Sequence, residues 1–427
     1  MSLRPSVLFV AVASRLHVER ARRTAAKAFS SLEALDVELL GTPEPILEAD
    51  ALLGALSKTA DLLVVFVSSG GTSRLLRTAL KGREAIVWAH PNDNSLPSAL
   101  SAREKLRALG AWRAEIAFSP PDKAPRAVRA EIAGLRALNE LRESEILAVC
   151  GPEKAAELET VLEGLLGPWR PEFKRLEPEE LLRKAEEHTA PPSLSDAVAM
   201  LRGIDVEQAT PELEEGLVRS AQLASFLASE LLAGARRPII TFDCFDFLEE
   251  SGLAPCVVLA LLMERGIPAV CEADPAALVL MALCQSLTGS IPWMANLARA
   301  DPAGGTLMLT HCTACPSLSA SWPYRGVLMS HFESGKPVAL DVWLKRGPVV
   351  LANLQPGVRR LVLARGRIVD SGLGEEGLCR TQALVELDGD VRAFLEATSN
   401  HHIVCYTDIT EELARIGRRL GLDVVRL

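Results

Sequence analysis

Residues 310–316, THCTACP, place one histidine and two cysteines directly behind the apolar run at 307–309. Histidine and cysteine bind zinc, and paired cysteines also carry redox chemistry. A structural zinc site needs four ligands, and no second C-x-x-C or H-x-x-x-H pair completes Cys312 and Cys315. A thioredoxin-type pair opens a helix in an early strand–helix unit, whereas this pair lies far along the chain. We therefore expect no zinc at these thiols and take His311 as the functional candidate.

Two further segments share the layout that ends on His311, an apolar strand with a polar side chain at its carboxyl end. PIITFD ends on Asp243, and IPAVCE ends on Glu272. Ligands of α/β sheets bind beyond the carboxyl ends of strands. We therefore expect the three segments to be neighbouring strands of one α/β unit and these three side chains to converge on one cleft. Asp243 also fits a simple helix cap, and a histidine at a strand end is often only a satisfied core residue. A carboxylate directly behind IPAVC needs a partner, which favours a functional Glu272.

The elements that must position these residues begin with alternating strand and helix patterns over residues 1–143. Apolar runs at 7–13, 62–68 and 85–91 are typical of buried strands, and amphipathic stretches separate them. Such alternation predicts a parallel sheet with helices on both faces. The loop SSGGTS at 68–73 follows the second of these strands, where open α/β sheets place ligand loops. A plain tight turn is the other interpretation, because the loop matches no phosphate-binding motif.

A second α/β unit begins at ILAVCGP, after a long helical stretch. Within it, Asp274-Pro275 predicts a helix start, with aspartate as the cap and proline at the first helical position. From about residue 326, short apolar runs alternate with turn sequences such as SGKP and QPGVR, which is typical of antiparallel strands. The sequence therefore predicts an α/β protein with two flavodoxin- or Rossmann-like parallel-sheet domains and then a β-rich, barrel-like domain that completes the active site, at residues 1–143, 144–300 and 301–427.

The composition excludes several classes of protein. The chain has 427 residues, of which 48% are hydrophobic and 24% charged, so it can bury sizeable cores and is not disordered. The net charge of −9 is spread along the sequence without a block of lysines and arginines, so we expect no nucleic-acid partner. The apolar stretches are too short to span a membrane, and nine scattered cysteines indicate reduced thiols. We expect a cytoplasmic protein with no membrane partner.

The longer motifs resemble the L-fucose isomerase and L-arabinose isomerase superfamily, and its fucose-isomerase-like branch most. The resemblance covers residues 235–427 and rests on APC with IPAVCE, followed by LTHCTACP, HFESG, CRTQ and SNHH. It implies two α/β domains before a β-rich one, and a divalent metal, usually Mn²⁺, held by two carboxylates and histidine. It also implies interconversion of aldose and ketose sugars through an enediol. A homo-oligomer such as a hexamer, with active sites shared between subunits, would follow.

Carried over position by position, the resemblance assigns Glu272 and His311 to the metal, together with one histidine of SNHH. We choose His401 over His402 because the Asn-His order matches the family's single histidine, and because neighbouring side chains of a strand face opposite ways. The second carboxylate corresponds to Asn296, whose carbonyl oxygen could hold a metal but whose amide cannot accept a proton. Another carboxylate would then act as the base, and the candidates are Glu333, which we favour, Asp243 and Asp246.

Our main interpretation is a metal-dependent aldose–ketose isomerase. The absence of the second carboxylate leaves open a lyase or hydrolase that uses the same metal site on a polyhydroxylated substrate. A non-catalytic sugar-binding protein on the same scaffold is a third interpretation. The joint presence of Glu272, His311, Glu333 and His401 argues against it, because a sensor has no need of all four.

Overall fold

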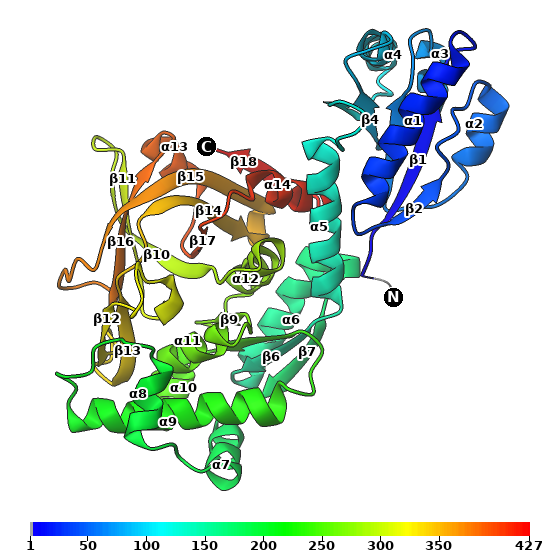
Figure 1. Cartoon of the computed structure of the whole chain (residues 1–427). Helices are drawn as coiled ribbons and strands as arrows, with labels where there is room; N and C mark the ends of the chain where they lie inside the picture. The colour runs from blue at the N-terminus through cyan, green and yellow to red at the C-terminus, as the bar shows by residue number, and fades with distance from the viewer. Residues whose placement is uncertain (1–2) are drawn as a thin grey trace. The chain divides into compact units, whose positions relative to one another are not determined.

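The computed structural model describes residues 3–427, and the chain divides into two compact units, Met1–Asn139 and Glu140–Leu427. The first unit contains a parallel sheet of five strands in the order β2-β1-β3-β4-β5, flanked by helices (Figure 1). Its strands are β1 (Ser6–Val12), β2 (Glu38–Gly41), β3 (Leu62–Val67), β4 (Ile86–Ala89) and β5 (Glu115–Phe118). Its helices are α1 (Val18–Glu33), α2 (Ala49–Ala55), α3 (Ser73–Leu80) and α4 (Ser95–Ala108), and the boundary between the units falls within the last turn of α5 (Arg126–Arg142). The predicted parallel α/β sheet is confirmed.

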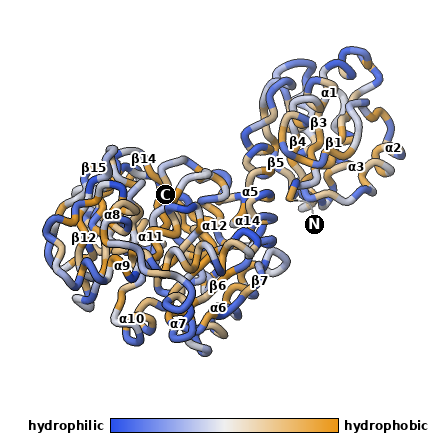
Figure 2. Tube along the Cα trace, turned by 60° about the horizontal axis from the view of Figure 1, so that its bottom comes forward, coloured by the Kyte–Doolittle hydropathy of each residue, from blue (hydrophilic) through white to orange (hydrophobic). Residues whose placement is uncertain are grey.

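The central strands of this sheet are buried on both faces, which explains why they are continuous apolar runs. Alternate side chains of each strand enter opposite cores because the side-chain period of a strand is two. Phe9, Phe66 and Trp88 pack in one core, and Val10 and Val65 pack in the other. Coloured by hydropathy, the interior strands of the unit are orange and its periphery is largely blue (Figure 2).

The second unit begins with a smaller parallel sheet in the order β7-β6-β8-β9. Its strands are β6 (Glu145–Val149), β7 (Glu172–Leu176), β8 (Pro238–Phe242) and β9 (Ala269–Val270). The helices around it are α6 (Pro152–Leu166), α7 (Pro178–His188), α8 (Leu194–Met200), α9 (Pro211–Phe226), α10 (Cys244–Ser251), α11 (Cys256–Glu264) and α12 (Pro275–Thr288). Each of the two units thus contains a parallel β-sheet with helices around it, as the sequence predicts.

Antiparallel strands after α12 close into a barrel. The ring runs β14-β17-β10-β11-β16-β15 and closes because β15 pairs with β14. Its strands are β10 (Trp293–Asp301), β11 (Thr306–His311), β14 (Gly347–Gln355), β15 (Arg360–Ser371), β16 (Thr381–Leu387) and β17 (His402–Cys405). The remaining elements are the hairpin β12 (Gly326–Ser330) and β13 (Pro337–Val342), the helices α13 (Val391–Ala397) and α14 (Thr410–Arg419), and β18 (Asp423–Arg426), which pairs parallel to β15. The β-rich, barrel-like C-terminal part is confirmed.

Helix α12 joins the sheet to the barrel. It contacts β9 of the sheet and also β14 and β17 of the barrel, and its residues 276–284 are all buried (Figure 1). A helix covered on all sides must be apolar all round, which the sequence PAALVLMALC satisfies. The amino end of α12 consequently lies where the carboxyl end of β9 meets the barrel.

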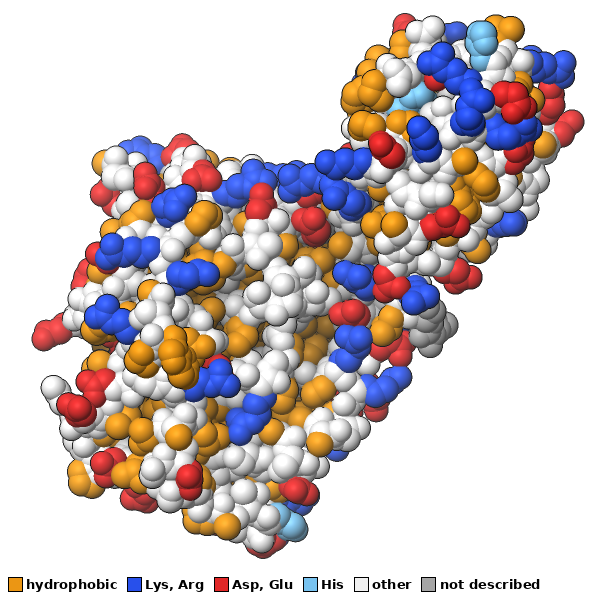
Figure 3. All heavy atoms as spheres, in the orientation of Figure 1, with side chains coloured by type: hydrophobic (Ala, Val, Ile, Leu, Met, Phe, Trp, Pro, Cys, Tyr) orange, Lys and Arg blue, Asp and Glu red, His pale blue; other side chains and the backbone are white. Residues whose placement is uncertain are grey.

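The surface of the protein carries acidic and basic side chains interspersed with one another on the face shown in Figure 3. In the part of the chain from residue 3 onward, no helix combines the length and the apolar character needed to cross a bilayer.

Candidate metal centre

Three side chains that the sequence singled out meet at this junction. Glu272 follows β9, His311 ends β11, and His401 precedes β17. One oxygen or nitrogen atom from each lies within 4.8 Å of the others. His401 Nε2 is 3.1 Å from Glu272 Oε2, and His311 Nε2 is 3.7 Å from Glu272 Oε1. The parallel sheet thus supplies one member of the cluster, and the barrel supplies the other two.

The route by which His311 reaches the cluster differs from our expectation. We expected β11 to lie beside β8 and β9, but β11 is a barrel strand between β10 and β16. The prediction of three neighbouring strand ends is therefore wrong for His311, although its side chain does lie beside Glu272. Pairing between strands that are distant in sequence decided this outcome, and a strand's own pattern does not encode its partner.

The two ring nitrogens that face Glu272 lie at ion-pair distance from its carboxylate but make no well-aligned hydrogen bond to it. His311 Nε2 and His401 Nε2 are both buried and lack a partner, although the His401 nitrogen is near enough to Glu272 for one. Buried polar atoms nearly always form hydrogen bonds, so two buried nitrogens that face the same carboxylate without a well-aligned one require an explanation. A divalent cation provides it, because imidazole nitrogens and a carboxylate oxygen are ligands of Mn²⁺, Mg²⁺ and Co²⁺. The residues present therefore fit such a cation.

Neighbouring residues orient both rings. His401 Nδ1 lies 2.5 Å from Asp274 Oδ2, and His311 Nδ1 lies 2.9 Å from Thr313 Oγ1. Since an ionised Asp274 can only accept, the Nδ1–H of His401 donates to it and the Nε2 atom faces Glu272. Asp274 Oδ1 also accepts the N–H groups of Ala276 and Ala277, which confirms the predicted helix cap. One carboxylate thus starts α12 and fixes a histidine of the cluster.

The backbone at the cluster is strained. Glu272 and Ala273 have φ values of 62° and 44°, and His401 has a φ of 62°. This left-handed region costs an L-residue about 1 kcal/mol or more, and such residues gather at functional sites. The strain persists because Ala273 N donates to Phe242 O and because the buried Asn353 Nδ2 donates to His401 O at 3.0 Å.

The charges of the cluster are mutually stabilised. Burial raises the pKa of Glu272, but contact with His311 and His401 outweighs burial and leaves this pKa below its usual range. Burial lowers the pKa of His401, whereas Asp274 and Glu272 raise it, to about 9 overall. His401 is therefore protonated at neutral pH when no cation is bound. A metal that binds its Nε2 must displace that proton.

Asn296 lies beside the cluster and is engaged by a neighbouring amide. It stands in β10 opposite Thr310, and its Oδ1 atom accepts from Asn400 Nδ2 at 3.0 Å. Asn400 Oδ1 in turn accepts from the N–H of Leu297 at 3.3 Å. The two amides thus connect β10 to the turn that carries His401.

The three candidate bases lie in different surroundings, and Asp246 is exposed on α10. Burial raises the pKa of Asp243, and the negative charge of Asp246 raises it further. Over the described residues 3–427, the metal-type group does not include Asp243. Glu333 is exposed in the turn after β12. Contact with Cys312 and burial raise the pKa of Cys379, and the charges of Glu333 and Glu272 add to that rise, so both carboxylates lie near one thiol.

The cysteines of THCTACP lie away from the cluster's ligand atoms. Cys312 packs with Cys256 and Cys379, while Cys315 is fully buried, and all are free thiols. Over residues 3–427, the metal-type group of histidine, cysteine and carboxylate side chains consists of Glu272, His311 and His401.

Sequence reasoning missed two functional neighbours. Asp274 was interpreted only as a helix cap, although its second oxygen was free to hold a ring. Asn353 was passed over, although a lone amide within the apolar strand GPVVLANLQ is itself a signal, since a buried amide needs partners.

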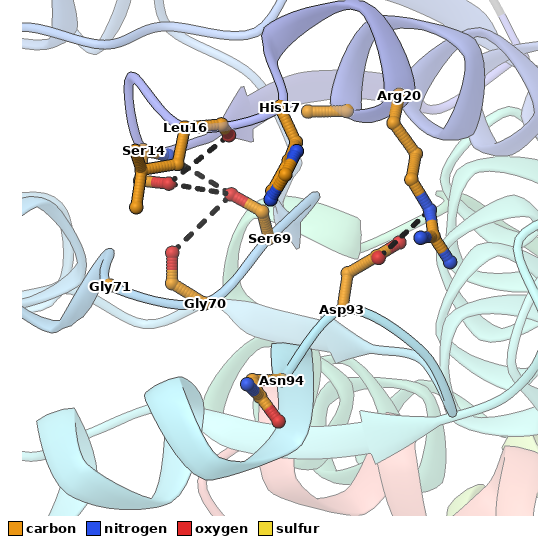
Figure 4. Close-up of a pocket in the computed structure, with 10 residues that line it drawn as sticks. Ser14, Leu16, His17, Arg20, Ser69, Gly70, Gly71, Asp93 and Asn94 are labelled. Atoms are coloured by element: carbon orange, nitrogen blue, oxygen red, sulfur yellow. Dashed lines mark hydrogen bonds and ion pairs between the residues drawn. The ribbon is translucent and has the colours of Figure 1, made fainter.

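A pocket in the first unit includes the predicted ligand loop. Its volume is about 450 Å³, and it lies beyond the carboxyl ends of β1, β3 and β4, where Ser14 N donates to Ser69 Oγ and Arg20 pairs with Asp93 at 2.9 Å (Figure 4). A volume of this size is in the range of small-molecule sites. The loop at 68–73 therefore lines a pocket at the point where the strand order reverses, the usual ligand position of this fold.

Asp274→Asn tests the orienting contact. The new amide oxygen would still cap α12, but the negative charge beside His401 would be lost. We expect metal affinity to fall by about 10- to 100-fold with little loss of stability. Calorimetric titration with Mn²⁺ measures this, with Asp390→Asn, which alters the cap of α13, as the matched control. Unchanged affinity would show that Asp274 only caps the helix.

Comparison with known proteins gives distant relatives. The chain is 26% identical over 220 residues to the sulfoquinovose isomerase of Priestia aryabhattai, which covers 49% of this chain and 48% of that protein. It is 26% identical over 259 residues to that of Alkalicoccus urumqiensis, covering 55% and 57%, and 24% identical over 355 residues to that of Clostridium sp. (strain MSTE9), covering 77% and 75%. The chain thus spans about half the length of the first relatives it matches. No family model matches.

Proposed function

We propose that this chain is a metal-dependent aldose–ketose isomerase acting on a sugar. The observation that carries the proposal is the pair of unsatisfied Nε2 atoms that converge on Glu272. The similarity to sulfoquinovose isomerases supports the sugar substrate and the reaction class. We further propose Mn²⁺ as the metal, a homo-oligomer, a cytoplasmic location and the three-domain division given above.

The chemistry assigns a task to each group. A divalent cation held by Glu272, His311 and His401 would polarise the oxygens on C1 and C2 of the sugar, which eases loss of the C2 proton. Glu272 remains ionised, so it can serve as a ligand or take up a proton. Once a cation displaces the Nε2 proton of His401, the hydrogen bond to Asp274 would hold the ring in the tautomer whose Nε2 lone pair faces the site. The half-buried to buried setting of all three groups keeps water from competing for them.

A proton must also move between the two carbons, and Glu333 is the proposed carrier. Isomerisation requires a base beside C2 and an acid beside C1. Glu333 is a carboxylate on an exposed turn. Its negative charge, like that of Glu272, raises the pKa of the Cys379 thiol. Asp243 is the weaker candidate, because the metal-type group among residues 3–427 does not include it.

Asn296→Asp tests the departure from the family's two carboxylates. A carboxylate beside the cation adds negative charge, so we expect tighter Mn²⁺ binding and at least retained turnover. The hydrogen bond from Asn400 Nδ2 should be kept, because a carboxylate oxygen of the new aspartate can accept the same N–H. Metal titration and turnover on one preparation decide the point. Tighter metal binding with loss of activity would show that the amide donates to an anionic intermediate and would contradict the mechanism.

Removal and return of the metal tests the proposal as a whole. The protein is treated with a chelator, reloaded with Mn²⁺, Mg²⁺ or Co²⁺, and incubated with a panel of aldoses, while NMR follows ketose formation. We expect interconversion only after reloading. Full activity of the chelated protein, with metal absent by elemental analysis, would refute metal dependence.

A lyase or hydrolase remains the second candidate, and the amide of Asn296 is the observation that favours it. Without a second carboxylate at this position, one proton-transfer partner of the isomerase reaction is missing. The same NMR experiment separates the two functions, because a lyase or hydrolase yields products with a different carbon count or mass.

A further inference from the structure

The turn that carries His401 is a short irregular segment of the barrel. It spans residues 398–401, between α13 and β17. β17 lies between β14 and β10, and its pairing with these two strands ends at Ile403 and at His402, respectively. The strand pairing thus stops before it reaches His401, and other contacts must hold the turn.

Two amide residues stand at the points where this pairing ends. Asn353 follows Ala352, the last residue of β14 that pairs with β17. Asn296 follows Ala295, the last residue of β10 that pairs with β17. Because both partners run antiparallel to β17, the two amides lie on either side of the place where β17 opens into the turn.

Asn353 binds the turn through both ends of its amide. Its Nδ2 atom donates to Asn400 O at 3.1 Å and to His401 O at 3.0 Å, and it also contacts the carbonyl and hydroxyl oxygens of Ser399. Its Oδ1 atom accepts from Ser399 N at 3.1 Å. The residue is 1% exposed, so water does not compete for these bonds. One buried amide therefore does for the turn what a strand ladder does for β17.

Other amides hold this arrangement from both sides. Gln355, two residues further along β14, donates from Nε2 to Asn353 Oδ1 at 2.9 Å and to Ala397 O at 2.7 Å. On the β10 side, Asn400 Nδ2 donates to Asn296 Oδ1 at 3.0 Å. A buried polar network whose members are bonded to one another favours a single geometry.

The geometry of the turn sets the direction of the His401 ring. His401 has a φ of 62°, a left-handed value that an L-residue keeps only when its surroundings impose it. Its carbonyl oxygen is one of the atoms that Asn353 binds. Without that bond the backbone is free to leave the left-handed region, and a change in φ turns the ring away from Glu272.

We propose that Asn353 is a positioning residue of the metal centre, which holds the backbone of the turn so that His401 Nε2 faces Glu272. Asp274 acts on the same residue through its ring, whereas Asn353 acts through its backbone. The inference rests on the proposed function, since it assigns Asn353 a task toward the cation that this function requires. The other interpretation is that Asn353 only completes the end of α13, because the last C=O groups of a helix need partners.

Metal binding by Asn353→Ala is the first test. Calorimetric titration with Mn²⁺ should show affinity lowered by about 10- to 100-fold, the range for residues that orient metal ligands. The Co²⁺-loaded protein gives a second readout, because its visible spectrum depends on the number and geometry of the ligands. We expect that spectrum to change. An Asn353→Ala protein that is less stable but keeps the native Mn²⁺ affinity and Co²⁺ spectrum would overturn the proposal.

Combination with Asp274→Asn separates positioning from general stabilisation. Because both residues hold one ring, the double variant should lose at least about 3-fold less affinity than the product of the two single losses. Gln222→Ala is the matched control, since Gln222 Nε2 donates to Thr189 O at 2.7 Å, just after α7. The control should lower stability, keep the native affinity and combine additively with Asp274→Asn. Additive losses for Asn353→Ala and Asp274→Asn would contradict a shared action on the ring.

Gln355→Ala decides the point if Asn353→Ala does not fold. Gln355 is only half-buried, and its truncation removes the bonds to Asn353 Oδ1 and Ala397 O. We expect Mn²⁺ affinity to fall by about 2- to 10-fold, the worth of one hydrogen bond. Native affinity in this variant would overturn the proposal in that case.

Failure of this inference and failure of the proposed function give different results. If the native protein binds Mn²⁺ but converts no aldose, the proposed function fails, and the losses in the Asn353→Ala titrations still establish the positioning role. If the native protein converts an aldose and Asn353→Ala binds Mn²⁺ and Co²⁺ as the native protein does, the proposed function stands and the positioning role fails. A native protein that binds neither metal would contradict both.

Discussion

Glu272→Gln is expected to abolish metal-dependent turnover while leaving the protein folded. Glutamine has nearly the same shape, but it removes the negative charge to which both Nε2 atoms are directed. The pKa of His401 should fall as well, because Glu272 is one of the two carboxylates that raise it. Metal content after dialysis and ketose formation measure the two effects.

The control for this variant is Glu386→Gln, which changes an exposed carboxylate on β16 of the same barrel. It should retain full metal content and turnover. A Glu272→Gln protein that binds Mn²⁺ as tightly as the native protein would show that the ion lies elsewhere.

His401→Ala is expected to lose metal binding, whereas His402→Ala is expected to lose stability. His401 faces Glu272, so its loss should remove metal binding and turnover. His402 is fully buried, its Nε2 lies 2.7 Å from Thr398 Oγ1, and its ring packs on Phe394. Burial lowers the pKa of His402 to about 3, so it is a neutral core residue. Its truncation should cost about 2–4 kcal/mol of unfolding free energy and leave metal binding intact.

Chemical denaturation and metal titration of both variants measure these outcomes. If His402→Ala loses the metal while His401→Ala keeps it, the proposed ligand set is wrong. If both variants lose the metal and unfold early, the turn before β17 matters more than either ring.

The strands and the α/β layers were predictable because their signals are local. The runs at 7–13 and 62–68 are almost the same residues as β1 and β3, since a strand buried on both faces is a continuous apolar run. The predicted cap at Asp274 is also correct, because capping depends on a few neighbouring residues.

The partnerships between distant segments were not predictable in this way. Nothing in TLMLTH states that β11 pairs with β16 in a barrel, because antiparallel partners are chosen by the whole fold. The contact between Asp274 and His401 joins residues 127 positions apart. Candidate residues could thus be identified by type and position, whereas the second contacts that orient them required the structure.

Exchange of the C2 hydrogen in D₂O is the measurement that tests the central claim most directly. The Mn²⁺-loaded protein is incubated with an aldose of the panel that it converts, and NMR follows both ketose formation and deuterium at C2 of the recovered aldose, with the Glu272→Gln variant in parallel. The account predicts that recovered aldose gains deuterium at C2 as ketose forms, and that neither change occurs with Glu272→Gln. Ketose formation and C2 exchange that proceed equally with the native protein and with Glu272→Gln would contradict proton transfer at the Glu272, His311 and His401 centre.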